Sequence, residues 1–338
     1  MLKYLLLTAF LLMVSSQAAT ITVAPSGADF SSIQAASDAA NFGDLINITP
    51  GVYSENLIIN KTIALRGIGA PVIEIGGQHA NGPAIMLLAD GISLEGLVVV
   101  NPSSTAGEPS GTGIEVHSSN NTISANIIKG AFGSGINLFN SSNNTIARNQ
   151  GNSSLTGLSL RYSSFNSIMS NNFSYNQGDG ISLNYSKNNT VESNEVSYNR
   201  GRGFALDSAD NNSLLYNTAS YNRASGLYLH NSNNNQIYQN NFINNTGYNV
   251  FDDGLNRWGD SWMGNYYSDI NCTDSNDDGV CDSPYRIPGG TNTDTFPSPQ
   301  PIMILFYEVA SDILSGWESY LDDSPPKDDE TKEATELI

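Results

Sequence analysis

The sequence predicts an all-β fold, a right-handed parallel β-helix of about 22–23 residues per coil, with a short N-terminal capping helix and a C-terminal helix. A glycine followed by alternating apolar and polar residues recurs six times, in steps of 22, 22, 23, 23 and 23 residues. Self-similarity at such a short period is typical of a solenoid, in which each coil contacts only its neighbours. The six repeats begin at Gly113, Gly135, Gly157, Gly180, Gly203 and Gly226.

Each repeat has room for three short strands and three turns, but not for a helix. In the repeat from Gly180 to Arg202, Ile181 and Leu183 alternate with polar residues, which predicts a strand with one buried face. The aliphatic residues one and three positions after each repeat glycine are therefore expected to form the core.

Asparagine recurs at fixed distances after the repeat glycines, which predicts three ladders at the corners of the coils. Stacked coils lie roughly 4.8 Å apart, so an amide side chain can donate to one neighbouring coil and accept from the other. Asparagine also tolerates the left-handed backbone conformation that turns require. The columns are Asn121, Asn144, Asn166, Asn189, Asn212 and Asn235; Asn126, Asn149, Asn171, Asn194, Asn217 and Asn240; and Asn176, Asn199, Asn222 and Asn245.

The two ends of the chain differ from the repeats. Residues 1–18 contain Lys3, an apolar run and a small-residue cleavage site, which is typical of a secretory signal peptide. Ser31 and Gln34 predict a capping box at a short helix, which we expect to cover the first coil. The rest divides into the solenoid (19–262), a C-terminal cap with a calcium-like loop (263–300), an amphipathic helix (301–321) and a disordered acidic tail (322–338).

The formal charge of −19 argues against nucleic acid and anionic membranes as partners. It suits divalent cations, high salt or solubility alone. After the signal peptide, no apolar run reaches the roughly 20 residues that a transmembrane helix needs. We therefore expect a secreted, periplasmic or cell-surface protein without a membrane span, whose helix over 301–321 docks back or binds a protein partner.

A short acidic loop near the C-terminus predicts a calcium site. Oxygen-bearing side chains occupy its first, third, fifth and ninth positions, and Gly279 occupies the sixth, where a calcium loop turns sharply. The twelfth position is Tyr285 and not glutamate, so the loop is not a complete EF-hand, and a solvated acidic turn is the alternative. Cys272 and Cys281 flank the loop and are expected to form a disulfide in an exported chain. The predicted ligands are Asp274, Asn276, Asp278 and Asp282.

Charged residues at two positions of the repeat are the candidates for catalysis. Arg161 and Asp207 share a column four residues after the repeat glycine, while Asp179 and Arg202 directly precede a repeat glycine. Polysaccharide enzymes with this fold use paired carboxylates or an arginine–aspartate set in a groove. The sequence shows no dense carboxylate pair, so a solvated, decorated face is the alternative.

The three histidines are scattered. His117 and His230 fall in the same column, five coils apart, which separates them by roughly 24 Å. His79 lies in an irregular loop. A shared three-histidine copper or zinc site is therefore not expected.

Two stretches resemble known families. Residues 43–67 (GDLINITPGVYSENLIINKTIALRG) resemble the first coils of carbohydrate-binding and sugar-hydrolase (CASH) β-helix domains. The motifs GNYYSD from Gly264, DG at 278–279, DSPY at 282–285 and DTFP at 294–297 resemble the closing signature of NosD-type proteins. The resemblance covers about residues 20–300 and implies the β-helix fold. NosD-type proteins are periplasmic and assist copper-site assembly of nitrous-oxide reductase, whereas many similar chains are exported surface proteins.

These observations lead to three functional hypotheses. The first is a secreted or cell-surface β-helix that binds a polysaccharide or another cell-envelope component without catalysis. The second is a carbohydrate-active enzyme, a lyase, hydrolase or epimerase, that uses Arg161, Asp179, Arg202 and Asp207. The third is a NosD-like copper-site maturation factor, which the chain's own histidines do not favour.

Overall fold

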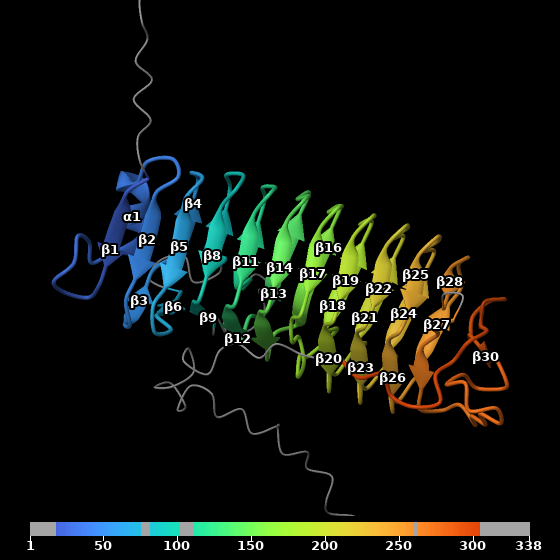
Figure 1. Cartoon of the computed structure of the whole chain (residues 1–338). Coiled ribbons are helices and arrows are strands. Elements are labelled where there is room, and N and C mark those ends of the chain that lie inside the picture. Colours follow the sequence, from blue (N-terminus) through green and yellow to red (C-terminus); the bar gives the residue numbers. More distant parts are fainter. Residues whose placement is uncertain (1–17, 76–81, 102–110, 260–261, 305–338) are drawn as a thin grey trace, which may run out of the picture.

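The computed structural model describes residues 18–75, 82–101, 111–259 and 262–304. These residues form one stack of parallel coils, along which the chain advances from one end to the other (Figure 1). The predicted parallel β-solenoid is confirmed, and its right-handed winding stays a prediction. The predicted signal peptide up to residue 17, the amphipathic helix from residue 305 onward and the acidic tail lie outside the described residues. No helix in the described part of the chain has the length and apolar character that crossing a bilayer requires.

Three parallel sheets, here called A, B and C, form the faces of the stack, and each strand pairs with its equivalents in neighbouring coils. Sheet A contains β1 (Thr20–Val23), β2 (Leu45–Ile48), β5 (Ala64–Gly67), β8 (Ser93–Glu95), β11 (Thr122–Ser124), β14 (Thr145–Ala147), β17 (Ser167–Met169), β19 (Thr190–Glu192), β22 (Ser213–Leu215), β25 (Gln236–Tyr238) and β28 (Arg257–Trp258). Sheet C contains β4 (Leu57–Ile59), β7 (Ile85–Leu87), β10 (Ile114–Val116), β13 (Ser134–Phe139), β16 (Thr156–Arg161), β18 (Ile181–Asn184), β21 (Phe204–Asp207), β24 (Leu227–His230) and β27 (Val250–Asp252).

Sheet B has two parts, which Asn172 connects through isolated bridges to Gln150 and Glu195. The first part contains β3 (Val52–Ser54), β6 (Val72–Glu74), β9 (Val98–Val100), β12 (Ile127–Lys129) and β15 (Gln150–Asn152). The second part contains β20 (Glu195–Ser197), β23 (Thr218–Ser220), β26 (Asn241–Ile243) and β29 (Tyr266–Tyr267). Near the C-terminus, β30 (Tyr285–Arg286) and β31 (Thr293–Asp294) form a separate antiparallel pair.

Most strands of the three sheets contribute one or two aliphatic side chains to the core, as the repeat pattern predicts. In the coil that begins at Gly180, Ile181 and Leu183 of sheet C meet Val196 of sheet B, and all three are fully buried. A Cβ atom added to Gly180 would lie only 2.8 Å from the Cβ of Val196. The repeat glycine is therefore needed because sheets B and C approach each other too closely for a side chain there.

The asparagine ladders are present at all three corners. Asn171 donates its backbone N–H and its side-chain amide to Oδ1 of Asn194, over 3.0 and 2.9 Å. The same Asn171 amide also donates to the Ile146 carbonyl, over 2.8 Å. Asn171 thus uses both amide protons, and its own oxygen accepts two bonds from Asn149, so a buried polar column costs little.

The sequence predicts that the ladder asparagines have the left-handed backbone conformation, but the residues directly before them have it instead. Asn188, Ser193 and Tyr198 have φ values of 56°, 54° and 58°. The left-handed residue turns its own side chain outward, and Tyr198 is 48% exposed. The next residue can then point its amide inward to the ladder.

The short N-terminal helix is confirmed as α1 (Ile33–Ala39), but its predicted capping box is wrong. The N-cap residue is Ser32, whose hydroxyl accepts from the Ala35 N–H. The carboxylate of Glu55, from a later coil, accepts the N–H groups of Ile33 and Gln34 over 2.9 and 3.0 Å. The carboxylate of Glu55 thus accepts N–H groups at the start of the helix, where the sequence predicts a local contact from the Gln34 side chain. Ile33 is buried in the solenoid core, and the capping role of α1 stays a prediction.

Candidate functional site

The outer side of sheet C carries the residues that the sequence singles out. Its central column consists of small side chains on successive coils, and the next column is charged or polar. We call these two columns the sheet C face. They are Ser159, Ser182 and Ala205 in the centre, and Arg161, Asn184 and Asp207 beside them.

The predicted candidates lie on two opposite margins of this face. Arg161 and Asp207 are in one column, with Asn184 on the coil between them. Asp179 and Arg202 lie five residues before Asn184 and Asp207, at the other end of the strands. At about 3.3 Å per residue, the two margins are roughly 17 Å apart. The structure therefore places the four residues around the face and does not bring them together at one point.

Asp179 and Arg202 do contact each other, but through the backbone. Oδ1 of Asp179 accepts the backbone N–H of Arg202 over 2.7 Å. The Arg202 guanidinium lies over the ring of Tyr228, 4.2 Å from its centroid. Asp179 thus shapes the turn, and Arg202 is held against an aromatic ring.

Aromatic rings border the sheet C face along its charged margin and at its downstream end. The upstream aromatic group runs across successive coils, with ring centroids 5.3–6.1 Å apart. In the downstream aromatic group, Tyr228 stacks on Phe251 at 4.7 Å and Tyr248 lies 5.6 Å from Phe251. Sequence reasoning missed Tyr228 and Phe251. The sequence signal that could have identified them is their position in the central column, which small residues occupy on the three coils before Tyr228. The upstream group is His117, Phe139, Tyr162 and Tyr185.

A histidine–carboxylate pair borders the downstream group. Nδ1 of His230 lies 2.6 Å from Oδ2 of Asp253, on the next coil. His230 continues the column of Arg161 and Asp207. At the other end of that column, Nε2 of His117 lies 3.2 Å from Oε1 of Glu115. Each of these histidines therefore has its own carboxylate partner.

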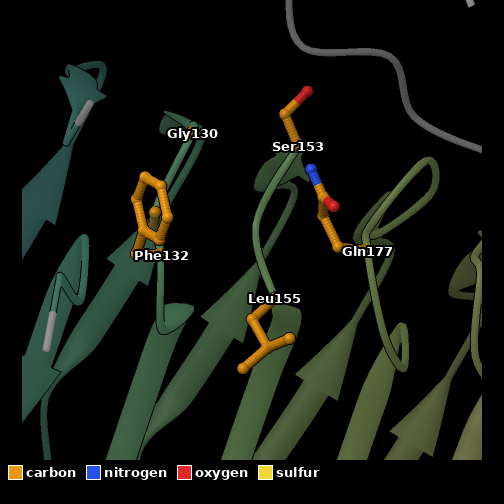
Figure 2. Close-up of a pocket in the computed structure, with 6 residues that line it drawn as sticks. Gly130, Phe132, Ser153, Leu155 and Gln177 are labelled. Carbon is orange, nitrogen blue, oxygen red and sulfur yellow. The ribbon is translucent and has the colours of Figure 1, made fainter. Parts of the chain in front are cut away.

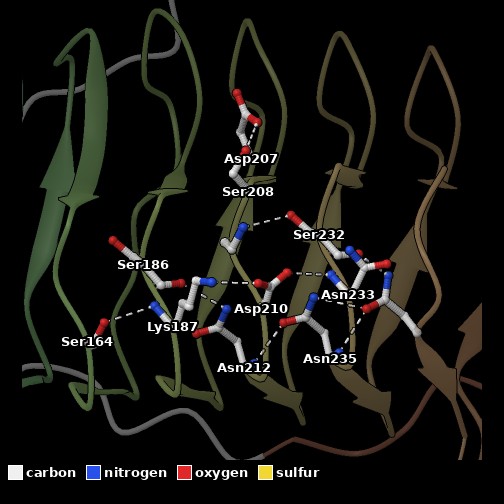
Figure 3. A network of polar contacts seen from close by, with 12 residues as sticks. Ser164, Ser186, Lys187, Asp207, Ser208, Asp210, Asn212, Ser232, Asn233 and Asn235 are labelled. Carbon is white, nitrogen blue, oxygen red and sulfur yellow. Dashed lines mark hydrogen bonds and ion pairs between the residues drawn. The ribbon is translucent and has the colours of Figure 1, made fainter.

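The Asp207 carboxylate is exposed, with the Ser208 hydroxyl donating to it over 3.1 Å. Figure 3 shows it apart from the network in the following turn, where Lys187 pairs with Asp210 and the Asn233 N–H also donates to Asp210. The hydrogen bond from Lys187 lowers the pKa of the Asp210 carboxyl. Asp210 has a structural role, whereas Asp207 is available to a ligand.

A small pocket of about 260 Å³ lies in the turns between sheets B and C (Figure 2). On the next coil Tyr175 takes the place of Ser153, whose N–H donates to the Tyr175 carbonyl. Tyr175, Tyr198 and Tyr221 stack at 5.1 and 5.0 Å. The pocket thus opens where this exposed tyrosine row ends. It is lined by Gly130, Ala131, Phe132, Ser153, Leu155 and Gln177.

The acidic loop is folded by its own hydrogen bonds. Asp274 accepts the N–H groups of Asp278 and Gly279 over 3.1 and 3.0 Å, and Gly279 has a φ of +81°. The Asp282 carboxylate accepts from the Ser275 hydroxyl over 2.6 Å. Hydrogen bonds from the hydroxyl and the backbone N–H of Ser275 lower the pKa of the Asp282 carboxyl.

The predicted disulfide between Cys272 and Cys281 is confirmed. Across the described residues, no three His, Cys, Asp or Glu side chains lie close enough together to hold a metal ion. His79 lies outside those residues. Calcium binding by Asp274, Asn276, Asp278 and Asp282 stays a prediction.

Residues 75–272, more than half of the chain, match the family described as periplasmic copper-binding protein (NosD). The chain belongs to the NosD family. The matched range contains the whole sheet C face and ends at the first cysteine of the disulfide. Most of the closing motif from Gly264 to Pro297 lies beyond it. No curated protein matches the chain.

Several solved structures are similar to this NosD-family chain. Pectate lyase Pel9A has 19% identity and a TM-score of 0.55, and the match covers 74% of each chain. The enzymatically active domain of bacteriophage CBA120 tailspike protein 2 has 14% identity and a TM-score of 0.50, over 72% of this chain and 43% of that one. The periplasmic alginate epimerase AlgG has 16% identity and a TM-score of 0.39, over 64% and 60% of the two chains. The chain thus spans less than two thirds of the tailspike domain and of the epimerase.

Proposed function

We propose that this NosD-family protein is exported and binds a polysaccharide or another cell-envelope glycan along the sheet C face, without turning it over. One observation carries the proposal. A floor of small side chains, Ser159, Ser182 and Ala205, lies beside a row of charged and amide side chains. One aromatic group runs along the outer margin of that row, and the other lies at the downstream end of the floor.

This arrangement suits a chain of sugar rings. The small floor lets a flat ligand approach the backbone, while Arg161, Asn184 and Asp207 offer donors and acceptors for hydroxyl groups. Aromatic faces along the margin and at the downstream end can stack on the apolar faces of sugar rings. From Phe139 to Tyr228 the face spans four coil steps, or roughly 19 Å, which is enough for an oligosaccharide. The family's periplasmic description supports an exported location.

The separation of the charged candidates supports binding without turnover. Acid–base cleavage of a glycoside needs two carboxyl groups roughly 5–9.5 Å apart on either side of the bond. Asp179 and Asp207 lie on margins roughly 17 Å apart, and the Asp179 carboxylate already holds the Arg202 backbone.

The experiment is a binding titration of the full chain with a panel of envelope and plant polysaccharides. We expect Tyr228→Ala and Arg161→Ala each to weaken binding about tenfold or more, equivalent to about 1.4 kcal/mol. Lys187→Ala is the matched control, because Lys187 pairs with Asp210 in a turn away from the face. Equal affinities in all three variants would remove the sheet C face as the binding site.

A carbohydrate-active enzyme is the second candidate, and the His230–Asp253 pair favours it. A histidine held by a carboxylate is a usual general base, and His230 lies one coil from Asp207. An enzyme would release new sugar ends or unsaturated products from a bound polysaccharide. Loss of that release in His230→Ala or Asp207→Ala, with binding retained, would replace the first proposal by this one.

A copper-site maturation factor is the third candidate, and the family description favours it. His117 and His230, the histidines of the described chain, each contact a carboxylate and lie roughly 24 Å apart. Stoichiometric copper binding that is lost in His230→Ala but retained in Tyr228→Ala would support this role.

A further inference from the structure

The outer side of sheet B is covered, although its side chains point away from the core. Val72, Val98 and Ile127 form one outward column on successive coils, and they are 0%, 5% and 1% exposed. Together with Ala70 they make an apolar cluster that is separate from the solenoid core. An outward apolar column with so little exposure has something packed on it.

The cover extends along the sheet. In the neighbouring outward column of the later coils, Ser174, Ser197 and Ser220 are 3%, 0% and 8% exposed. Burial also raises the pKa of Glu195, which stands beside Ser197 on the same outer side. The covered surface is thus a stripe across many coils and not a single contact.

The described C-terminal segment forms the start of this cover. Ser298 makes a bridge to Tyr266 on the last coil. Ile302 then exchanges two hydrogen bonds with the side chain of Asn241, one coil earlier, over 2.8 and 2.9 Å. Between Ser298 and Ile302 the chain therefore runs back toward the N-terminal end, past β26 (Figure 1). Residues 301–304 are not helical, in contrast to the prediction, because Asn241 holds the backbone of Ile302.

We propose that residues 305–321 continue in this direction as an amphipathic helix and pack on the apolar cluster of Ala70, Val72, Val98 and Ile127. The length fits. The three non-helical steps from Ile302 to Leu305 cover up to about 10 Å, and a helix from Leu305 to Leu321 rises about 24 Å at about 1.5 Å per residue. From Asn241 the same outward column reaches Ile127 after five coils and Val98 after six, roughly 24 and 29 Å away.

The chemistry fits as well. The apolar stripe of the segment would face the cluster, and its acidic residues would face water. The sheet C face lies on another side of the stack, so the docked segment would leave the proposed glycan site open. The stripe consists of Leu305, Phe306, Val309, Ile313, Leu314, Trp317 and Leu321.

Disulfide trapping in the full chain tests the placement. Val309 lies four helical residues, about 6 Å, beyond Leu305, and the three non-helical steps from Ile302 add about 10 Å. Asn172 lies three coils from Asn241, roughly 14 Å away. We expect the pair Asn172→Cys and Val309→Cys to close an intrachain disulfide in dilute protein under mild oxidation. The control pair, Ser182→Cys with Val309→Cys, places the first cysteine on the sheet C face and is expected to stay reduced. Peptide mapping separates both from the native Cys272–Cys281 bridge.

Hydrogen exchange in the full chain gives a second readout. Trp317→Asp is expected to speed exchange of the β9 and β12 amides, because a carboxylate cannot pack on Val98 and Ile127. Ser315→Asp, outside the apolar stripe, is the matched control. A disulfide that forms only between two chains would assign the covered stripe to a second copy and overturn the proposal. Unchanged exchange in Trp317→Asp together with no trapping would assign the cover to another segment, such as residues 102–110, and would also overturn it.

Discussion

Asn265 donates both its backbone N–H and its side-chain amide to one carboxylate oxygen of Asp294, over 2.8 and 3.0 Å. This pair ends the second asparagine ladder, in which every amide donates toward the C-terminal end of the stack. The other two ladders end in the same way. Asn256 donates to Asp252, and Asn249 donates to Asp269. A column that donates in one direction needs a final group that only accepts, and an ionised carboxylate is such a group.

Asp294→Asn is therefore expected to destabilise the fold by about 1–3 kcal/mol, the cost of leaving a buried donor unsatisfied. Oδ2 of Asp294 accepts from Asn265 and from the Tyr267 hydroxyl, and Oδ1 accepts the Phe296 N–H. An amide in its place would point N–H groups at donors. Urea unfolding measures the difference. Asp277→Asn, at an exposed loop position, is the control, and equal stability of the two variants would contradict the role of the carboxylate.

The ladders themselves could be predicted from the sequence, but their ends could not. Columns such as Asn171 and Asn194 recur at the repeat period, and the period alone sets the register. Asp294 lies 29 residues after Asn265, beyond the repeats, and only the return of the chain over the last coil brings it into place. The same holds for Glu55, which caps α1 from more than 20 residues away.

The candidate site could be predicted to a similar extent. The column of Arg161, Asp207 and His230 follows from the register. The contact of Asp179 with the Arg202 backbone depends on turn geometry, for which the sequence has no periodic signal. The alternation that predicts a strand around Tyr228 does not distinguish a ring in the central column from the small side chains that occupy it on the three preceding coils.

A serine column provides a matched stability test. The N–H of Ser163 donates to the Ser186 hydroxyl over 3.0 Å, and the N–H of Ala209 donates to the Ser232 hydroxyl over 3.0 Å. Ala209 occupies the same column but has no hydroxyl to accept from Ser186. Ala209→Ser is expected to add about 0.5–1.5 kcal/mol of stability, the net value of one hydrogen bond. Ser163→Ala, the reverse change two coils earlier, should lower stability in the same urea titration. If Ala209→Ser lowers it as well, the column is limited by space and not by hydrogen bonding.

Calcium is expected to raise the melting temperature of metal-stripped protein. The spacing of the predicted ligands resembles that of a calcium loop; they are Asp274, Asn276, Asp278 and Asp282. A ligand at a hundred times its Kd adds about 2.7 kcal/mol to the free energy of unfolding of a protein that binds it only when folded. Asp278→Ala should abolish the rise. Asp277→Asn, one position away from the predicted ligands, should keep it, since its φ of 57° suits asparagine. The absence of any rise in the unaltered protein would leave the loop as an acidic turn closed by the Cys272–Cys281 disulfide.

Glu195→Gln is expected to raise the melting temperature at pH 7 but not at pH 4. Burial raises the pKa of the Glu195 carboxyl in the folded protein, partly offset by the hydrogen bond with Ser197. A raised pKa means that the folded state holds the proton more tightly than the unfolded chain does. The stabilising effect is therefore complete below the unfolded pKa, about 4.3, and is lost as the pH rises through the folded value. Glutamine keeps the contact with Asn172 without ever ionising.

Melting curves of both proteins from pH 4 to 7 should diverge with rising pH, whereas Glu192→Gln, on the same coil in sheet A, should run parallel to the unaltered protein. A difference between Glu195→Gln and the unaltered protein that stays constant across this range would mean that the carboxylate is well solvated and that the outer side of sheet B is open to water at this coil.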